Sequence, residues 1–224
     1  MPDLLLDALP VIDLLEITAS TTAVAELTQR DQSSVSRIYR QASDKLGLQF
    51  AKGPSGHYRA GSNQALLKEL RRSSQRLRLT HRMELRWLGC SWSPALAHGT
   101  DACPPLPNRS SCLQRTCDLV RDHLLDLAVL PGRLLLPANA EELLPRQVVP
   151  LACGQLLALP LVRYRGPLLN QHQARPIATG PHEVEVLVLR RDLQSEPALM
   201  ELVDAVAQAY RNAFRHRPDL DWLR

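Results

Sequence analysis

The segment of residues 31–47, DQSSVSRIYRQASDKLG, constrains the fold more than any other part of the chain, because its end chemistry and its periodicity agree. Asp31 is a favoured N-cap residue and Gly47 is a favoured C-cap residue, so both limits of a helix are marked. Between them, apolar residues recur at the spacing of one helical stripe: Val35, Ile38, Ala42 and Leu46. The segment therefore predicts an amphipathic helix with one buried face.

The opposite face of this predicted helix carries short polar side chains at its start and mostly basic ones further along: Gln32, Ser33, Ser36, Arg37, Arg40 and Lys45. Short side chains permit close approach to the major groove of DNA, where amide and guanidinium groups bond base edges and cations neutralise phosphates. Taken alone, the segment fits a DNA-reading helix and an ordinary solvated helix equally well.

Composition indicates a globular chain of one or two domains, with 45% apolar and 22% charged residues over 224 positions. Aromatic residues make up only 4%, which argues against an aromatic platform for single-stranded nucleic acid. The sequence contains neither a long uncharged apolar run nor a basic apolar leader. We therefore expect a cytoplasmic protein with no membrane partner.

Positive charge is concentrated in one part of the chain. Residues 30–82 contain twelve Lys and Arg against three acids, whereas the basic and acidic residues from position 83 onward cancel. A basic first third joined to a neutral remainder is typical of a DNA-binding module fused to a regulatory module.

The elements around residues 31–47 are predicted to complete a small DNA-binding domain. An apolar helix begins near Pro10, and a second helix over residues 22–30, capped by Ser20 or Thr21, turns Ala23, Val24 and Leu27 inward. Residues 48–61, LQFAKGPSGHYRAG, have the alternation and turn residues of a hairpin. Three helices followed by a hairpin predict a winged helix-turn-helix.

Residues 10–62 resemble the DNA-binding domain of LysR-type transcriptional regulators. The run DQSSVSRIYRQASDKLG is similar to the family's Ser-Gln-x-x-Val-Ser-x-x-Ile followed by Leu-Gly, and Ala60-Gly61 is similar to its closing Ala-Gly. Two positions depart from the pattern, since Ala42-Ser43 replaces a Leu-Glu pair and Lys52 replaces an arginine. The resemblance implies a transcription regulator that binds double-stranded DNA.

We expect DNA contacts from the predicted second helix, the reading helix and the hairpin. The expected residues are Thr22, Gln32, Ser33, Ser34, Ser36, Arg37, Arg40, Lys52, His57 and Arg59. Of these, Arg40, Lys52, His57 and Arg59 are expected to contact phosphates.

Residues 64–83 form a continuous helical pattern with a leucine stripe, while Arg71, Arg72, Arg76 and Arg78 lie largely outside the stripe. This segment resembles the family's linker helix, which implies a homodimer or higher homo-oligomer. The expected dimer contacts are Leu66, Leu67, Leu70 and Leu77. An ordinary helix packed on the second domain is the alternative interpretation.

Residues 85–224 alternate predicted strands and helices, which indicates an α/β regulatory domain of the periplasmic-binding-protein-like kind implied by the resemblance. We expect strands over residues 85–92, 124–130 and 183–192, a strand pair over 148–160, helices over 113–123 and 197–215, and loops over 94–111 and 161–181. About 140 residues follow the linker helix, so this regulatory domain is predicted to be shortened. The predicted division is therefore 1–62, 63–84 and 85–224.

The sequence lacks the common catalytic and nucleotide-binding motifs, so no enzyme activity, metal or cofactor is expected. Asp122, His123 and Asp126 are interpreted as surface or structural residues. The five cysteines, an odd number at irregular spacing, are Cys90, Cys103, Cys112, Cys117 and Cys153, and they are interpreted as free thiols.

The leading hypothesis is a dimeric LysR-type regulator whose shortened second domain serves oligomerisation or protein contact. Two alternatives stay open within the regulator class, a small-molecule effector or redox sensing through the cysteines. A third alternative is a winged-helix adaptor that binds protein and not DNA.

Overall fold

A computed structural model describes residues 3–52, 58–81, 84–89, 113–132, 135–136, 148–151, 154–164, 184–218 and 220–224. The chain is a mixed α/β protein of two compact units, Met1–Glu84 with Leu106–Leu125, and Leu85–Pro105 with Asp126–Arg224. The predicted division places residues 113–125 in the second domain, whereas in the structure they cluster with the N-terminal segment. Helix α5 (Leu113–Arg121) and the turn after it make polar contacts there, from Arg115 to Glu16 and from Arg78 to His123, that apolar periodicity does not reveal.

The N-terminal helices of the first unit begin with a π-helix, η1 (Leu4–Ala8), that continues into α1 (Leu9–Thr18) with Pro10 in its first turn. Helix α2 (Thr21–Leu27) follows, and the Ser20 hydroxyl caps it by accepting a hydrogen bond from the Ala23 N–H. Gln29 adopts the left-handed conformation, with φ at +52°, which ends α2 before the predicted Arg30. Leu27 is 38% exposed, so the prediction that it faces inward is wrong.

Helix α3 (Gln32–Leu46) confirms the predicted limits. The Asp31 carboxylate accepts a hydrogen bond from the Ser34 N–H at 2.7 Å, and Gly47 ends the helix with φ at +61°. A Cβ at Gly47 would lie 2.8 Å from Asn63 Nδ2 and would displace that side chain, and the positive φ itself disfavours any residue other than glycine. All four residues of the predicted apolar stripe are buried: Val35, Ile38, Ala42 and Leu46.

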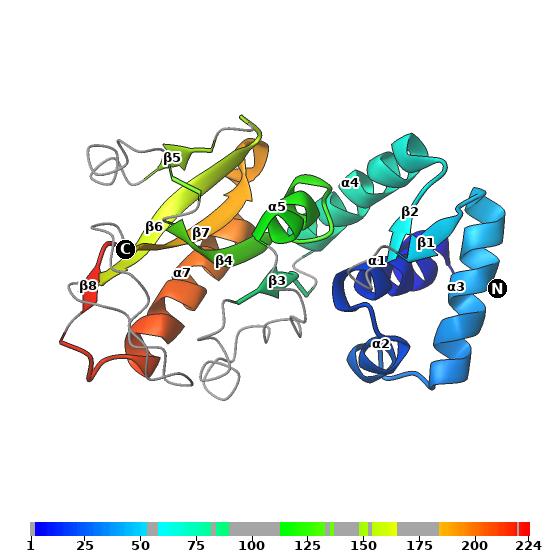
Figure 1. The fold of residues 1–224 in the computed structure, drawn as a ribbon, viewed down its shortest axis with the longest axis horizontal. Coiled ribbons are helices and arrows are strands. Elements are labelled where there is room, and N and C mark those ends of the chain that lie inside the picture. Colours follow the sequence, from blue (N-terminus) through cyan, green and yellow to red (C-terminus); the bar gives the residue numbers. More distant parts are fainter. Residues whose placement is uncertain are drawn as a thin grey trace. The chain divides into compact units, whose positions relative to one another are not determined.

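The predicted hairpin follows α3 as antiparallel strands β1 (Phe50–Lys52) and β2 (Tyr58–Ala60), with Phe50 opposite Ala60. Tyr39 of α3 contacts both strands, with its ring centre 5.2 Å from that of Phe50 and 6.5 Å from that of Tyr58. Such aromatic pairs stabilise a packing arrangement beyond the area that they bury. The hairpin is therefore held against the middle of α3 (Figure 1).

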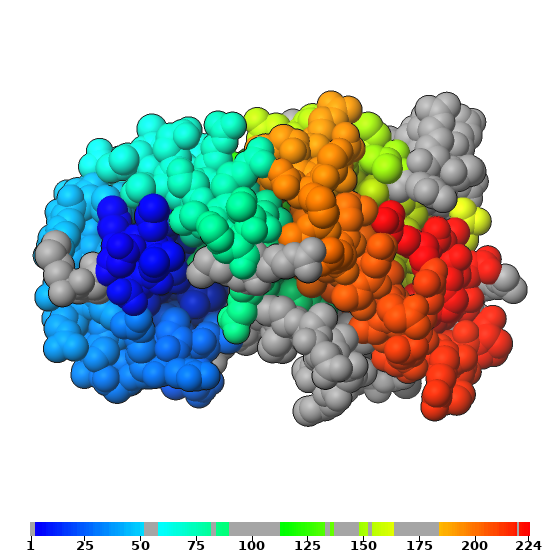
Figure 2. Space-filling view, turned by 180° about the vertical axis from the view of Figure 1, so that it is seen from behind, coloured from blue at the N-terminus to red at the C-terminus, as the bar shows by residue number. Residues whose placement is uncertain are grey.

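Helix α4 (Gln64–Thr80) contacts η1 on the surface of the first unit (Figure 2). Its buried face is more polar than the sequence predicts and consists of Leu67, Arg71, Ser74, Gln75, Arg78 and Leu79. The expectation that Arg71 and Arg78 lie outside the packed face is wrong, because both guanidinium groups find acceptors inside the unit. Arg72 and Arg76 are exposed, as predicted.

The second unit is built on a six-stranded sheet in the order β3 (Trp87–Leu88), β4 (Leu127–Pro131), β7 (Val184–Arg190), β6 (Leu156–Tyr164), β5 (Val149–Pro150), with β8 (Leu220–Trp222) paired to β6. Only β3 and β4 pair in parallel among these described strands. After the 3-10 turn η5 (Arg191–Leu193), helix α7 (Pro197–Ala213) lies along the sheet and buries its apolar stripe (Figure 1).

Two features of this sheet differ from the sequence prediction. Strand β6 continues through Tyr164 into the predicted turn-rich passage, and the short strand β8 was not predicted. Both belong to one pairing, in which Val162 lies opposite Trp222, so each strand supplies hydrogen-bond partners for the other. Residues 165–183 and the predicted loop over 94–111 lie outside the described residues.

Asp126 and His123 are structural residues. The buried Asp126 carboxylate accepts a hydrogen bond from the Arg86 N–H at 2.8 Å, which joins the starts of β3 and β4 in the second unit. In the first unit, Gln75 Nε2 donates to the Leu125 carbonyl, so its Oε1 accepts from His123 Nδ1 at 2.7 Å. These contacts fasten the chain after α5 to α4.

Candidate nucleic-acid interface

The first turn of α3 is organised by the Asp31 carboxylate. It accepts hydrogen bonds from the Ser33 hydroxyl at 2.5 Å and from the Ser34 N–H and hydroxyl at 2.7 Å each. These donors hold the pKa of Asp31 well below its usual range, with the Ser33 hydroxyl as the largest cause. The capping group therefore stays ionised and keeps two serines of the predicted interface in defined positions.

Polar side chains link α3 to α2 and to its own next turn. Gln32 Nε2 donates to the Thr21 hydroxyl at 2.7 Å, so the starts of α2 and α3 lie together. Arg37 Nη2 donates to the Ser34 hydroxyl at 3.2 Å, one turn along α3. Because these contacts hold the long side chains, less conformational entropy is lost if this surface binds a partner.

Most of the predicted DNA-contacting residues lie at the surface of α2 and α3. Exposed side chains are Thr22, Gln32, Ser33, Arg37 and Arg40, and partly buried ones are Ser34 and Ser36. Those on α3 lie outside its buried stripe, so the first half of this helix presents polar and basic side chains to the solvent. The Lys52 side chain and His57 lie outside the described residues.

Arg59 on β2 is also exposed, but it lines a pocket with residues of α4 and α5. The sequence predicted a phosphate contact for Arg59 and contained no signal for this second environment. The reason is that the other lining residues come from three separate segments of the chain.

A buried charge cluster in the first unit was also missed from the sequence. Arg71 of α4 donates to Asp13 and Glu16 of α1, and all three side chains are buried. Burial raises the pKa of Glu16, although Arg71 opposes this shift. The sequence did contain one sign of this cluster, since the acids Asp13 and Glu16 stand three residues apart in an otherwise apolar helical pattern. The cluster fixes α4, which follows the hairpin, against α1.

The predicted dimer contacts on α4 divide into two groups. Leu66 is 47% exposed, and Leu70 and Leu77 are partly buried on the same face. Leu67 is only 2% exposed, so its side chain already packs inside the first unit. Leu66, Leu70 and Leu77 are therefore the members of the stripe that a second copy can reach.

Within the described residues, no group of three or more metal-binding side chains comes together, and no helix is long and apolar enough to cross a membrane. Cys117 is buried on α5, while the other four cysteines lie outside the described part of the chain.

Fold and surface together define a two-unit α/β protein whose first unit presents a basic helix face beside a hairpin. Solved structures that align with the chain over most of its length include LysR-type transcription regulators, at 12–14% identity. A full-length variant of OxyR from Pseudomonas aeruginosa aligns with 12% identity over 94% of this chain and 95% of its own, with a TM-score of 0.47. Full-length LysG from Corynebacterium glutamicum aligns with 13% identity over 92% of this chain and 98% of its own, with a TM-score of 0.30. ArgP from Mycobacterium tuberculosis aligns with 14% identity over 91% of this chain and 97% of its own, with a TM-score of 0.28.

No family model matches the sequence, and no curated protein matches it either.

Proposed function

We propose that the first unit is a winged helix-turn-helix that binds double-stranded DNA, with α3 as the reading helix and the β1–β2 hairpin as the wing. The observation that carries this proposal is the exposed face of α3. Gln32 and Ser33 stand in its first turn, and Arg37 and Arg40 follow one and two turns later. Short polar groups at a helix start followed by guanidinium groups suit a major groove and its flanking phosphates.

The local environment of this face supports the proposal. The Asp31 carboxylate accepts three hydrogen bonds from Ser33 and Ser34, and these donors offset part of its negative charge at the start of α3. The Tyr39 ring contacts hold the hairpin against the same helix, and the hairpin carries the exposed Arg59. The excess of basic over acidic residues in positions 30–82 adds long-range attraction for a polyanion.

The proposed function also includes the formation of a dimer through α4. A second copy contacting Leu66, Leu70 and Leu77 of α4 would pair two reading helices and so recognise a two-fold DNA site. The chain is thus proposed to act as a LysR-type transcription regulator, with the second unit serving oligomerisation or protein contact.

A gel-shift titration of the full chain on DNA upstream of its own gene tests the proposal. Arg37→Gln should weaken specific binding by roughly tenfold or more, since a good bidentate base contact contributes about 1–3 kcal/mol. Arg40→Gln should weaken binding to all sequences and reduce the salt dependence. Arg191→Gln is the matched control, because Arg191 is an exposed arginine in the second unit.

Equal affinity of the wild type and the Arg37→Gln variant would rule out α3 as the reading helix. Complete absence of binding to duplex DNA would instead favour the protein-binding adaptor.

A further inference from the structure

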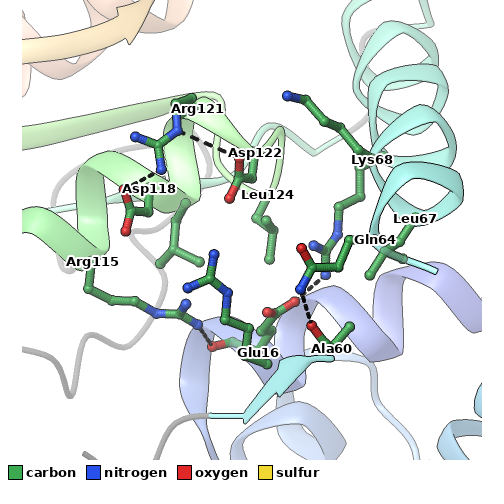
Figure 3. Close-up of a pocket in the computed structure, with 13 residues that line it drawn as sticks. Glu16, Ala60, Gln64, Leu67, Lys68, Arg115, Asp118, Arg121, Asp122 and Leu124 are labelled. Atoms are coloured by element: carbon green, nitrogen blue, oxygen red, sulfur yellow. Dashed lines mark hydrogen bonds and ion pairs between the residues drawn. The ribbon is translucent and has the colours of Figure 1, made fainter. Parts of the chain in front are cut away.

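The first unit contains a pocket of about 210 Å³ between the end of α1, the hairpin, α4 and α5 (Figure 3). Its floor and walls include the apolar side chains of Ala60, Leu67, Leu119 and Leu124. Charged side chains from each of the four elements border it, and basic residues outnumber acidic ones. Of its lining residues, only Arg59 belongs to the proposed DNA contacts.

Two of the basic side chains in this pocket already have carboxylate partners. Arg71 is paired with the buried acids of α1, as described above. Arg121 donates to Asp118 at 2.5 Å and lies 3.7 Å from the Asp122 carboxylate, both within or next to α5. These pairs satisfy every acidic side chain that lines the pocket: Glu16, Asp118 and Asp122.

Three other basic side chains lack a carboxylate partner among the described residues: Arg59, Lys68 and Arg115. They come from β2, α4 and α5, so the fold, not local sequence, brings them to one pocket. Arg115 Nη2 donates to the Glu16 carbonyl at 2.9 Å, while its buried Nε–H has no hydrogen-bond acceptor among the described residues. An unsatisfied buried donor is costly and usually marks a missing partner.

The electrostatic environment of Arg115 would be stabilised by a nearby negative charge. Burial lowers the pKa of Arg115; Glu16 opposes this shift, and the neighbouring positive charge of Arg59 adds to it. An oxyanion between the two guanidinium groups would offset their repulsion and accept hydrogen bonds from both.

We propose that this pocket binds a small oxyanion, a carboxylate or phosphate group of a metabolite, held by Arg59, Lys68 and Arg115. Guanidinium groups match the geometry of carboxylate and phosphate, and an ammonium group adds a compact third charge. At about 210 Å³ the pocket is smaller than a typical drug-sized site of roughly 300–1,000 Å³, so the ligand is small.

Binding of this kind would couple the hairpin to α4 and α5. The same Arg59 that is expected to contact a DNA phosphate would be engaged inside the protein. This consequence for DNA rests on the proposed function, whereas occupation of the pocket does not.

Isothermal titration calorimetry of the full chain without DNA tests the site directly, with inorganic phosphate, succinate and acetate as the probes. We expect phosphate or succinate to bind saturably with one site per chain. Lys68→Gln and Arg115→Gln should each weaken that binding by roughly tenfold or more, the effect of losing a charged hydrogen bond. Arg72→Gln, an exposed position on α4 outside the pocket, is the matched control and should bind as the wild type does.

Preference for phosphate over succinate would assign a phosphorylated ligand, and the reverse preference would assign a carboxylate. Absence of saturable binding by all three probes would overturn the proposal. A loss in Arg72→Gln equal to that in Lys68→Gln would overturn it as well, because it would show attraction to the surface charge in general. Circular dichroism of each variant confirms that the helices are retained, so that a loss of binding is attributed to the pocket.

Discussion

Arg71 Nε donates to Asp13 Oδ1 at 2.8 Å, and both side chains are shielded from solvent. The other end of the guanidinium group donates to Glu16, so one arginine of α4 satisfies two acids of α1. Buried charges are tolerated only where partners of this kind are present. The relationship fixes the helix that carries the predicted dimer contacts to the helix that supports α3.

Replacing Arg71 with methionine should destabilise the protein by about 3–5 kcal/mol, because the two acids lose their buried partner. Urea unfolding followed by circular dichroism measures the change. Arg72→Met is the neighbouring control on the exposed side of α4 and should shift stability by no more than about 0.5 kcal/mol. Similar unfolding midpoints for the two variants would contradict a structural role for the ion pairs.

The raised pKa of Glu16 predicts a pH effect of defined sign. A carboxyl group whose pKa is higher in the folded state than in the unfolded state stabilises the fold fully only below its unfolded pKa. That contribution is lost as the pH rises through the folded pKa. As the pH rises above the unfolded value of 4.5, the wild type should therefore lose stability relative to Glu16→Gln. Parallel stability curves for the two proteins would contradict the shift.

The Asp31 cap predicts the opposite pH behaviour. Its pKa is lowered in the folded state, so its contribution is present above the unfolded value of 3.8 and is lost as the pH falls through the folded pKa. Asp31→Ala should lower the melting temperature and weaken DNA binding, since the first turn of α3 loses its cap. Asp31→Asn keeps an acceptor and should retain most of both properties while losing the acid dependence. Equal damage by the two substitutions would show that capping is not the important interaction.

The exposed leucines of α4 predict how copies associate. Leu66→Asp should convert a dimer into a monomer, because a carboxylate would be buried in an apolar contact. Light scattering coupled to size-exclusion chromatography gives the mass of the particle. Ala65→Asp places the same charge at an exposed neighbouring position and should leave the dimer intact. A dimeric Leu66→Asp variant, or a monomeric wild type, would show that this face is not the interface.

Sequence alone was sufficient for elements whose limits and faces depend on local chemistry. The ends of α3 follow from Asp31 and Gly47, and its buried stripe follows from helical spacing. The hairpin was predictable for the same reason, because alternation and turn residues act over a few positions. The polar face of α3 was therefore predictable as well, since it is the remainder of the helix once the stripe is known.

Tertiary structure decided everything that depends on which segments meet. The buried face of α4 was assigned incorrectly, because the partners of Arg71 and Arg78 lie far away in the chain and periodicity treats both as solvent-exposed. Arg59, Lys68 and Arg115 share one pocket only because α5 packs with the first unit. Sequence by itself determined α3, the hairpin and the DNA-facing surface proposed for α3. The buried ion pairs and the pocket required the fold, because electrostatic partners are set by distance in space and not by spacing along the chain.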